Sequence, residues 1–236
     1  MKVLVLRTYD KDLKSHNGFQ WPDHGHVIAP DWDPIPECGH GLHGFLWGVG
    51  SFHLANWMDN AKWLVLEVES DQIVNLDGKV KFPECDVVFC GSRFDATKYL
   101  HEHLPPGFHP AIMGASIISG DNGISITGYS GVSTSGYGGH STSGVWGTSA
   151  SGICGKSTTG DYGKSTADYS GTATSGRYGT STSGYGGKCK SGLGGRIQIE
   201  WFDERSRLIV GYIGEDGLEP DVFYRVEDGK FIKCDD

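Results

Sequence analysis

Residues 120–199 read, in consecutive blocks of eight, GDNGISIT, GYSGVSTS, GYGGHSTS, GVWGTSAS, GICGKSTT, GDYGKSTA, DYSGTATS, GRYGTSTS, GYGGKCKS and GLGGRIQI. The fourth position is glycine in all ten blocks, and the sixth is serine in seven of them. Flexible glycine-rich linkers have no such register, so the segment is predicted to be an array of structural repeats.

The side chains of each block predict one strand and one corner. Positions five to eight are rich in threonine and serine and read as a short strand, whose side chains point alternately to opposite faces. Positions six and eight are small and are expected to face a thin interior, whereas positions five and seven face water. Positions one to four form the corner, where glycine supplies a positive φ or a crowded backbone. The ten corner glycines at position four are Gly123, Gly131, Gly139, Gly147, Gly155, Gly163, Gly171, Gly179, Gly187 and Gly195.

Two strands and two corners close one coil, so sixteen residues are expected per turn. Ten blocks then give about five stacked coils, about 4.8 Å apart. Blocks two apart lie above one another, which predicts an aromatic ladder of Tyr137, Tyr169 and Tyr185, with Ile153 in the same column. Trp146, Tyr162 and Tyr178 form a similar column on the other edge. The predicted fold class is mainly β, a parallel β-solenoid of ten 8-residue units.

The pattern Gly-Tyr-Gly-x-x-Ser-Thr-Ser, in eights paired into sixteens, resembles the central repeat of bacterial ice nucleation proteins. That resemblance implies an inner serine ladder, a tyrosine ladder and outward threonine rows that bind ice. The outward threonines of the candidate binding face are Thr134, Thr142, Thr158, Thr166, Thr172, Thr174, Thr180 and Thr182. Lysines depart from the pattern at outward positions, at Lys156, Lys164, Lys188 and Lys190, and favour a self-stacking rod or spacer instead.

The flanks have a different composition and predict three domains. Residues 1–110 are expected to form an α+β domain, with strands at 3–6, 63–68 and 87–90 and helices at 95–104 and 52–60. Residues 111–195 are assigned to the solenoid. Residues 196–236 contain three alternating stretches, at 196–201, 208–213 and 222–226, and are expected to form a β-meander that caps the solenoid edge.

The flanking segments also resemble a domain family of unknown function, designated DUF7666. The stretches that carry the resemblance are residues 18–22 (GFQWP), 29–34 (APDWDP), 37–44 (ECGHGLHG) and 78–82 (GKVKF). The resemblance implies this architecture and a connection to actinobacterial and phage proteins. It brings no activity that can be transferred to this chain.

Cys38, His40 and His43 are the nearest approach to a metal-binding cluster. Zinc needs four ligands in tetrahedral reach, and this spacing is not a standard finger pattern. A tight turn in which His43 hydrogen-bonds the backbone is the alternative. No metal and no cofactor are therefore predicted. Six irregularly spaced cysteines favour reduced thiols.

One enzymatic alternative remains in the N-terminal domain. Arg7 at a strand end, with Glu67 and Glu69 on a later strand, faintly resembles ADP-ribosyltransferase-like folds. No phosphate-binding loop accompanies them, because Gly48-Val49-Gly50 alone is a weak signal. The chain is predicted not to be an enzyme.

The net charge of −9 makes nucleic acid an unlikely partner. No apolar run reaches membrane-spanning length and no signal peptide is recognisable, so a cytoplasmic location is expected. Residues 120–195 carry five basic and three acidic side chains between acidic flanks. That asymmetry favours self-association, as a homo-oligomer, or a protein partner. The predicted function is non-enzymatic binding or assembly, with ice binding by the threonine rows as an alternative.

Overall fold

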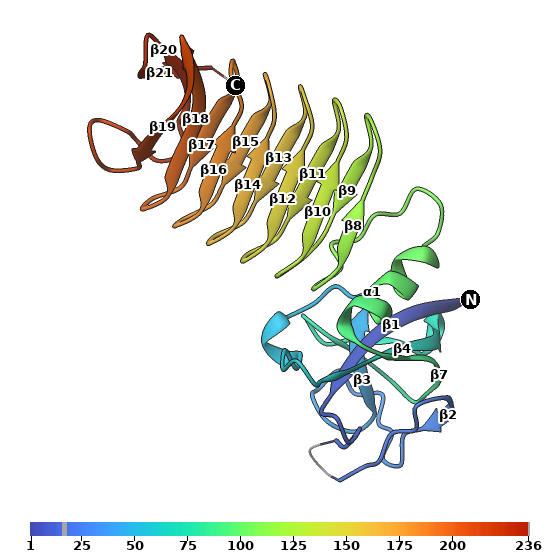
Figure 1. The fold of residues 1–236 in the computed structure, drawn as a ribbon. Coiled ribbons are helices and arrows are strands. Elements are labelled where there is room, and N and C mark those ends of the chain that lie inside the picture. Colours follow the sequence, from blue (N-terminus) through green and yellow to red (C-terminus); the bar gives the residue numbers. More distant parts are fainter. Residues whose placement is uncertain (16–17, 236) are drawn as a thin grey trace. The chain divides into compact units, whose positions relative to one another are not determined.

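The computed structural model describes residues 1–15 and 18–235 and divides the chain into two compact units, Met1–Ala115 and Ser116–Asp236 (Figure 1). The predicted fold class is confirmed, because most of the regular structure is β and the second unit is a parallel β-solenoid. None of the helices in the described residues combines the length and the apolar composition that crossing a bilayer requires.

The first unit is a seven-stranded antiparallel sheet in the order β2-β7-β4-β1-β3-β6-β5. Its strands are β1 (Lys2–Tyr9), β2 (Gly25–Ile28), β3 (Leu42–Leu46), β4 (Lys62–Glu69), β5 (Val74–Asn75), β6 (Val80–Phe82) and β7 (Glu84–Gly91). Helix α1 (Arg93–Glu102) contacts β1, β4 and β7. The apolar residues of β1 and β4 form continuous runs that are buried at successive positions, and Val5, Leu64 and Leu66 belong to the hydrophobic core of this unit.

One predicted helix of this unit is wrong. Residues 52–60 form only a 3-10 turn, Phe52–Leu54, after which Ala55 is extended. The backbone N–H of Asn56 donates to the Thr8 hydroxyl of β1 at 2.8 Å, so the chain is tied to the sheet instead of to its own preceding turn. The other predicted helix is α1, whose N-terminus is capped by the Ser92 hydroxyl accepting from the Asp95 N–H.

The second unit is the predicted solenoid. Its repeat strands are β9 (Ile124–Ile126), β10 (Val132–Ser135), β11 (His140–Ser143), β12 (Thr148–Ser151), β13 (Lys156–Thr159), β14 (Lys164–Ala167), β15 (Thr172–Ser175), β16 (Thr180–Ser183) and β17 (Lys188–Ser191). Even-numbered strands pair in parallel with even-numbered ones, and odd with odd, always sixteen residues apart, as at Val132 and Thr148. The coil of sixteen residues is therefore confirmed.

The solenoid begins before the first recognisable repeat. Strand β8 (Ser116–Ile118) pairs with β10 at the same sixteen-residue spacing, and Ile117 takes the inward position that serine holds in later coils. The glycine corner pattern is absent from this degenerate block, although the block lies within residues 111–195, the range assigned to the solenoid from the sequence.

Two hairpins, one on each sheet, close the C-terminal end. β18 (Arg196–Asp203) continues one sheet and turns back as β19 (Arg205–Tyr212), whereas β20 (Phe223–Glu227) joins β17 and pairs with β21 (Lys230–Cys234). The expected single meander is thus divided between the two sheets. Its inward side chains are large and apolar, at Ile197, Ile199, Ile213, Leu218 and Tyr224, and replace the serine interior with a hydrophobic core.

Candidate functional site

The interior of the solenoid contains a ladder of serine hydroxyls that cross from one sheet to the other between Ser133 and Ser165. Ser149 donates to the carbonyl of Ser141 at 2.7 Å, and Ser157 donates to that of Ser149 at 2.8 Å. Ser165 continues the series with a 2.8 Å bond to the Ser157 carbonyl. These side chains are fully buried, so the ladder stiffens the coils and leaves the outer surfaces for binding.

The glycines at position four lie in crowded backbone and not at a positive φ. A Cβ built on Gly155 would lie 2.7 Å from the Ser151 Cβ and 2.8 Å from the Gly139 carbonyl oxygen. Contacts of this kind recur at the other nine corner glycines. Corner glycine was predicted to supply either a positive φ or room in a crowded backbone. At position four it is the crowding that requires glycine.

The positive φ lies one residue earlier, at position three of each corner. Seven of these residues are not glycine: Asn122, Ser130, Trp146, Cys154, Tyr162, Ser170 and Tyr178. Each such residue costs about 1–2 kcal/mol in a left-handed conformation. Hydrogen bonds compensate, because the N–H of Trp146 donates to the Asp161 carbonyl of the next coil at 2.9 Å.

The outward threonines are divided between two opposite faces. The β14 face, defined as the outward side chains of β10, β12, β14 and β16, contains Thr134, Thr166, Thr180 and Thr182. The β13 face, formed by β11, β13, β15 and β17, contains Thr142, Thr158, Thr172 and Thr174. The predicted set of eight is therefore two half-sets on separate sheets.

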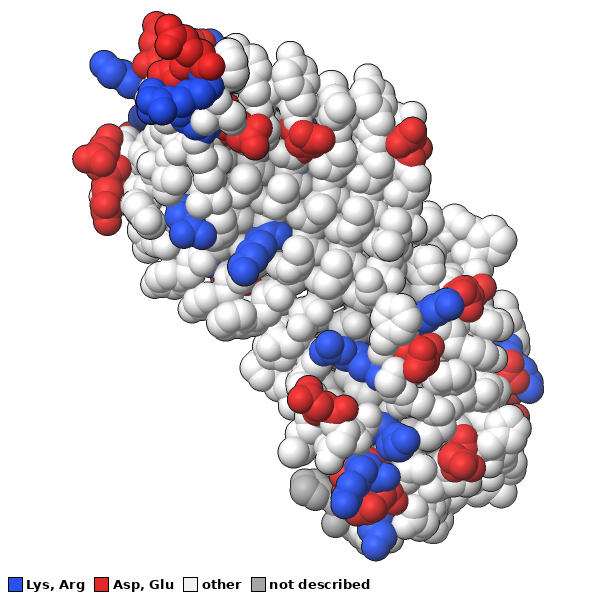
Figure 2. Space-filling model, viewed as in Figure 1, with Lys and Arg blue, Asp and Glu red and all other residues white. Residues whose placement is uncertain are grey.

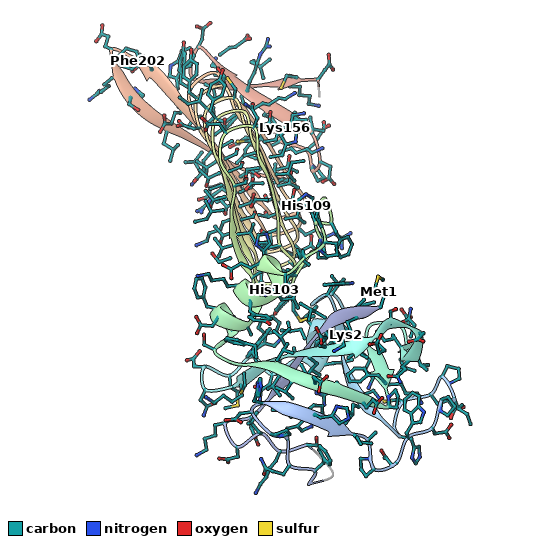
Figure 3. The ribbon with its side chains drawn as sticks, turned by 90° about the vertical axis from the view of Figure 1, so that its right-hand side faces the viewer. Met1, Lys2, His103, His109, Lys156 and Phe202 are labelled. Atoms are coloured by element: carbon teal, nitrogen blue, oxygen red, sulfur yellow. The ribbon has the colours of Figure 1, made fainter. Side chains whose placement is uncertain are left out.

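Charge distinguishes the two faces. Of the eight outward side chains of the β14 face, only Lys164 is charged. The β13 face carries three lysines, including Lys156, which lies on the outside of the solenoid in Figure 3. Charged side chains are sparse over the middle coils in the view of Figure 2. The β14 face is the larger uncharged surface of the repeat.

The C-terminal end of the β14 face is already occupied by neighbouring side chains. The hydroxyl of Thr182 donates to Gln198 at 3.0 Å, and Arg196 donates to the hydroxyl of Thr180 at 3.4 Å. The free part of this face is therefore its middle, on β10, β12 and β14.

Ring contacts occur in both aromatic columns, and the two columns differ in geometry. Trp146 and Tyr162 stack with ring centroids 4.6 Å apart, and Tyr162 and Tyr178 follow at 5.2 Å. In the predicted ladder, Tyr169 and Tyr185 are tilted at 6.1 Å, and Ile153 lies between Tyr137 and Tyr169. Trp201, sixteen residues after Tyr185, extends this column and was not predicted, although the same register identifies it.

The first unit contains a cavity of about 290 Å³. Its lining includes the side chains of Arg7 and Tyr9 from β1, His43 from β3, and Trp21 and Asp31 from the loops. Burial, together with the positive charges of Lys79, Arg7 and Lys81, lowers the pKa of His43 to about 4. His43 is therefore neutral at pH 7.

The structure does not bring Cys38, His40 and His43 together as a ligand set. In residues 1–15 and 18–235, no group of three or more His, Cys, Asp or Glu could hold a metal ion. The Sγ of Cys38 lies 2.9 Å from the Lys79 ammonium, whose hydrogen bond lowers the pKa of the thiol. His40 lies 3.7 Å from a carboxylate oxygen of Asp31.

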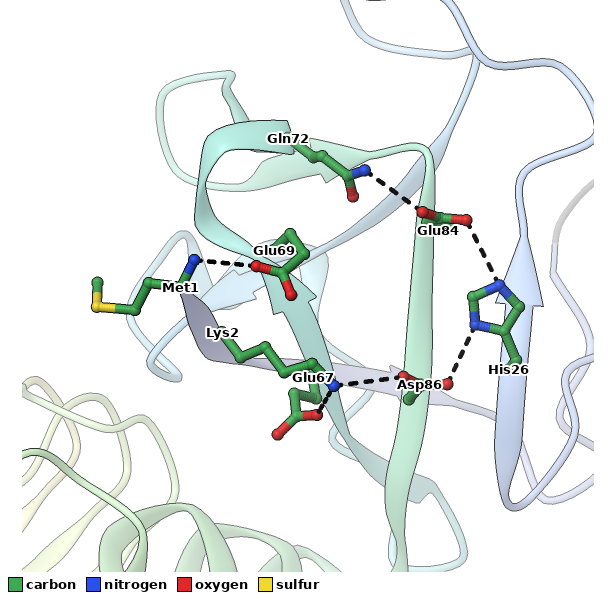
Figure 4. Close-up of polar contacts among 8 residues, drawn as sticks. All are labelled: Met1, Lys2, His26, Glu67, Glu69, Gln72, Glu84 and Asp86. Carbon is green, nitrogen blue, oxygen red and sulfur yellow. Dashed lines mark hydrogen bonds and ion pairs between the residues drawn. The ribbon is translucent and has the colours of Figure 1, made fainter.

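The residues of the enzymatic alternative are also separated. Glu69 pairs with the N-terminal amine of Met1, and Glu67 pairs with Lys2, in a network that continues through Asp86 to His26 (Figure 4). All of these groups lie near the first residue of β1. Arg7 is opposite Leu64 in the β1–β4 ladder, three residues along from Glu67, so these side chains form no common site.

Comparisons with known proteins agree with both resemblances. Residues 3–101 match the model of a family described as "Domain of unknown function (DUF7666)". The chain is 34% identical over 104 residues to ice nucleation protein InaU of Pantoea ananas, covering 43% of the chain and 10% of that protein. It is 38% identical over 105 residues to an ice nucleation protein of Pseudomonas fluorescens, covering 44% of the chain and 9% of the relative.

A third relative is an ice nucleation protein of Xanthomonas campestris pv. translucens, 38% identical over 107 residues, or 44% of the chain and 7% of the relative. The chain thus spans a tenth or less of the length of these curated relatives. No solved structure matches it.

Proposed function

We propose that this chain is a non-enzymatic binding protein, and that the β14 face of its solenoid binds the ordered water of an ice surface. The observation that carries the proposal is the in-register pairing of β10, β12, β14 and β16, which stacks their outward side chains into two straight rows. The ice nucleation proteins that share the repeat support the same ligand.

The rigidity of the coils and the kind of side chain that they display both suit the β14 face to an ordered lattice. A flat lattice is matched only by a surface whose groups are fixed before binding, because every group that must be ordered costs entropy. The buried serine ladder and the parallel hydrogen bonds fix the coils. Threonine adds a methyl group and a hydroxyl on a short, stiff side chain.

Lys164 interrupts the uncharged surface of this face. Its long, strongly hydrated ammonium stands among small side chains, between Thr148 and Thr180 in the same row. We expect the natural chain to bind ice weakly, and Lys164→Thr to strengthen the binding. Lys156→Thr on the β13 face is the matched control and is expected to change little.

The experiment measures the fraction of protein that partitions into a slowly grown ice shell, together with the shape of single ice crystals. The double variant Thr134→Lys with Thr166→Lys, on the free strands β10 and β14, should abolish both effects. Thr142→Lys with Thr158→Lys, at the same repeat position on the opposite sheet, is its control. Equal losses in the two double variants, or no enrichment in ice for the natural chain and for Lys164→Thr, would exclude the β14 face.

A second candidate function is self-association through the column of Trp146, Tyr162 and Tyr178. These rings are 45–57% exposed and stacked on one edge, which leaves a continuous apolar strip in contact with water. Sedimentation velocity tests it: Tyr162→Ser should shift an oligomer toward monomer. An aromatic contact survives added salt, whereas association between the basic repeat and the acidic flanks is lost.

The first unit is proposed to act in recognition and not in catalysis. The relatives that share the repeat are ice nucleation proteins of bacteria, so the suggested phage connection gains no support from them. The cytoplasmic location also stays a prediction.

A further inference from the structure

Arg7 is a half-buried cation that no carboxylate balances. Among residues 1–15 and 18–235, it forms no ion pair with an Asp or Glu, and its Nε is buried without a hydrogen-bond partner. Its guanidinium lies 4.7 Å from the centroid of the Tyr9 ring, which holds it at the wall of the cavity in the first unit. A guanidinium removed from water without a counter-charge is costly to the fold.

The groups around Arg7 add to its positive charge. His43 lines the same cavity, and its Nε2 is also buried without a partner. Lys79 and Lys81 lie close enough to depress the pKa of His43. Lys81 is almost fully buried and donates to the carbonyl of Glu37 at 3.0 Å.

One carboxylate faces this cavity among its described lining residues, and it is already engaged. Asp31 accepts from the backbone N–H of Gly41 at 3.1 Å and lies 3.7 Å from His40. It is partly exposed to solvent, and no ion pair joins it to Arg7. Among its described residues, the cavity therefore combines a guanidinium without a carboxylate partner, an imidazole nitrogen with free hydrogen-bonding capacity and nearby ammonium groups.

We propose that this cavity binds a small organic anion, in which a carboxylate or phosphate group pairs with Arg7 and His43 and the carbon skeleton lies against the apolar wall. That wall is formed by Phe19, Trp21, Pro30 and Leu42. The guanidinium fork matches the two oxygens of either anion.

The size of the cavity favours an organic ligand over an inorganic ion. A volume of about 290 Å³ is close to the lower end of small-molecule sites and is larger than a single carboxylate or phosphate group requires. An inorganic ion would leave the aromatic and aliphatic side chains of the lining in contact with water. A ligand with one anionic group and one ring fills both parts.

Isothermal titration of the full chain with phenyl phosphate, benzoate and phenol tests the proposal. Phenol carries the ring without the charge, and the two anions separate phosphate from carboxylate. Either anion is expected to bind and phenol is not. Arg7→Gln should weaken binding at least 10-fold, as expected for loss of a charged hydrogen-bonding partner. Arg93→Gln is the matched control, because Arg93 also lies over an aromatic ring, Trp57, but borders a different cavity.

A second variant keeps the test independent of how Arg7→Gln folds. Asp31→Asn removes the negative charge at the cavity and retains an oxygen that accepts from Gly41, so anions should bind severalfold more tightly. The proposal is overturned if neither anion binds the folded chain at millimolar concentration or if phenol binds as well as the anions. It is equally overturned if Arg7→Gln and Arg93→Gln behave alike, or if Asp31→Asn weakens binding.

Discussion

The indole ring of Trp146 lies parallel to the phenol ring of Tyr162, with 4.6 Å between ring centroids and 6° between ring planes. The two residues are sixteen apart, and both have left-handed backbones, with φ of 59° and 58°. The stack is thus built on a conformation that disfavours side chains. Ring stacking compensates Trp146 and Tyr162 for the cost of the left-handed backbone at position three. Ser170 has the same backbone conformation at position three, but it has no ring that could stack.

Replacing Ser170 with glycine should stabilise the solenoid. Ser170 has φ of 53°, and glycine adopts this conformation without steric cost. Glycine also gives the unfolded chain more freedom, so the net gain is expected to be about 0.5–1 kcal/mol. The reciprocal variant Gly186→Ser, one coil later at φ of 73°, should lose a similar amount. Urea unfolding followed by circular dichroism measures both, and a destabilised Ser170→Gly would contradict the strain argument.

Gly155→Val should destabilise the solenoid by more than about 3 kcal/mol, because the added side chain has to displace backbone as well as the Ser151 side chain. Gly120→Val is the matched control, since Gly120 has no positive φ and a Cβ there meets no atom within 4 Å. Thermal unfolding of both variants gives the comparison. Similar midpoints for the two would show that position four is not the crowded position.

The stability of the first unit should fall in acid through His43. Its folded-state pKa of about 4 lies below the ordinary value of 6.5. The unfolded chain therefore takes up a proton first as the pH falls, and stability that is present above pH 6.5 is lost progressively toward pH 4. Full shielding would correspond to about 3 kcal/mol, and partial exposure of the ring reduces this to about 1–2 kcal/mol.

Urea unfolding at pH 7.5 and pH 4.5, followed by tryptophan fluorescence, measures this effect, because five of the seven tryptophans lie in the first unit. His43→Gln should lose about 1–2 kcal/mol less than the natural chain between these two pH values. Parallel losses in the two proteins would assign the acid sensitivity to other groups.

Cys38 should be the first of the six cysteines to react with iodoacetamide at pH 7. The hydrogen bond from Lys79 lowers the pKa of this exposed thiol and so raises the thiolate fraction. Cys85 is buried, and burial raises its pKa to about 12. Lys79→Gln should slow labelling of Cys38 relative to Cys154, an exposed thiol in the other unit, as mass spectrometry of the peptides would show. An unchanged ratio would mean that exposure alone governs the reaction.

The solenoid could be predicted from the sequence because its information is local and repeated. Sixteen-residue pairing follows from the period of eight, and the register holds from Val132 through Ile199. The repeat pattern did not predict that the positive φ lies at position three of each block. Gly138 and Gly186 stand at position three beside tryptophan, tyrosine and serine in other coils, so composition there does not mark the constraint.

The candidate site of the first unit was harder to predict, because its members come from distant parts of the chain. In the sequence, Arg7 was considered with Glu67 and Glu69 as part of an enzyme site. His43 was considered with Cys38 and His40 as a metal ligand. Their meeting depends on β1 and β3 being neighbours in the sheet, which no local pattern specifies. By contrast, β21 follows the turn signal Asp228-Gly229 and could have been found.

The sixteen-residue pairing also limits how such a chain can change in length. Insertion or deletion of two blocks adds or removes one coil and leaves every later residue on its original sheet. A change of one block would transfer each later strand to the opposite sheet. Thr180 would then lie on the sheet that now contains Lys188, and Lys188 would lie on the sheet that now contains Thr180. The hairpins after β17 and β18 would then meet the wrong strands. Duplication by whole coils is therefore the route by which the surface can grow without rebuilding its end.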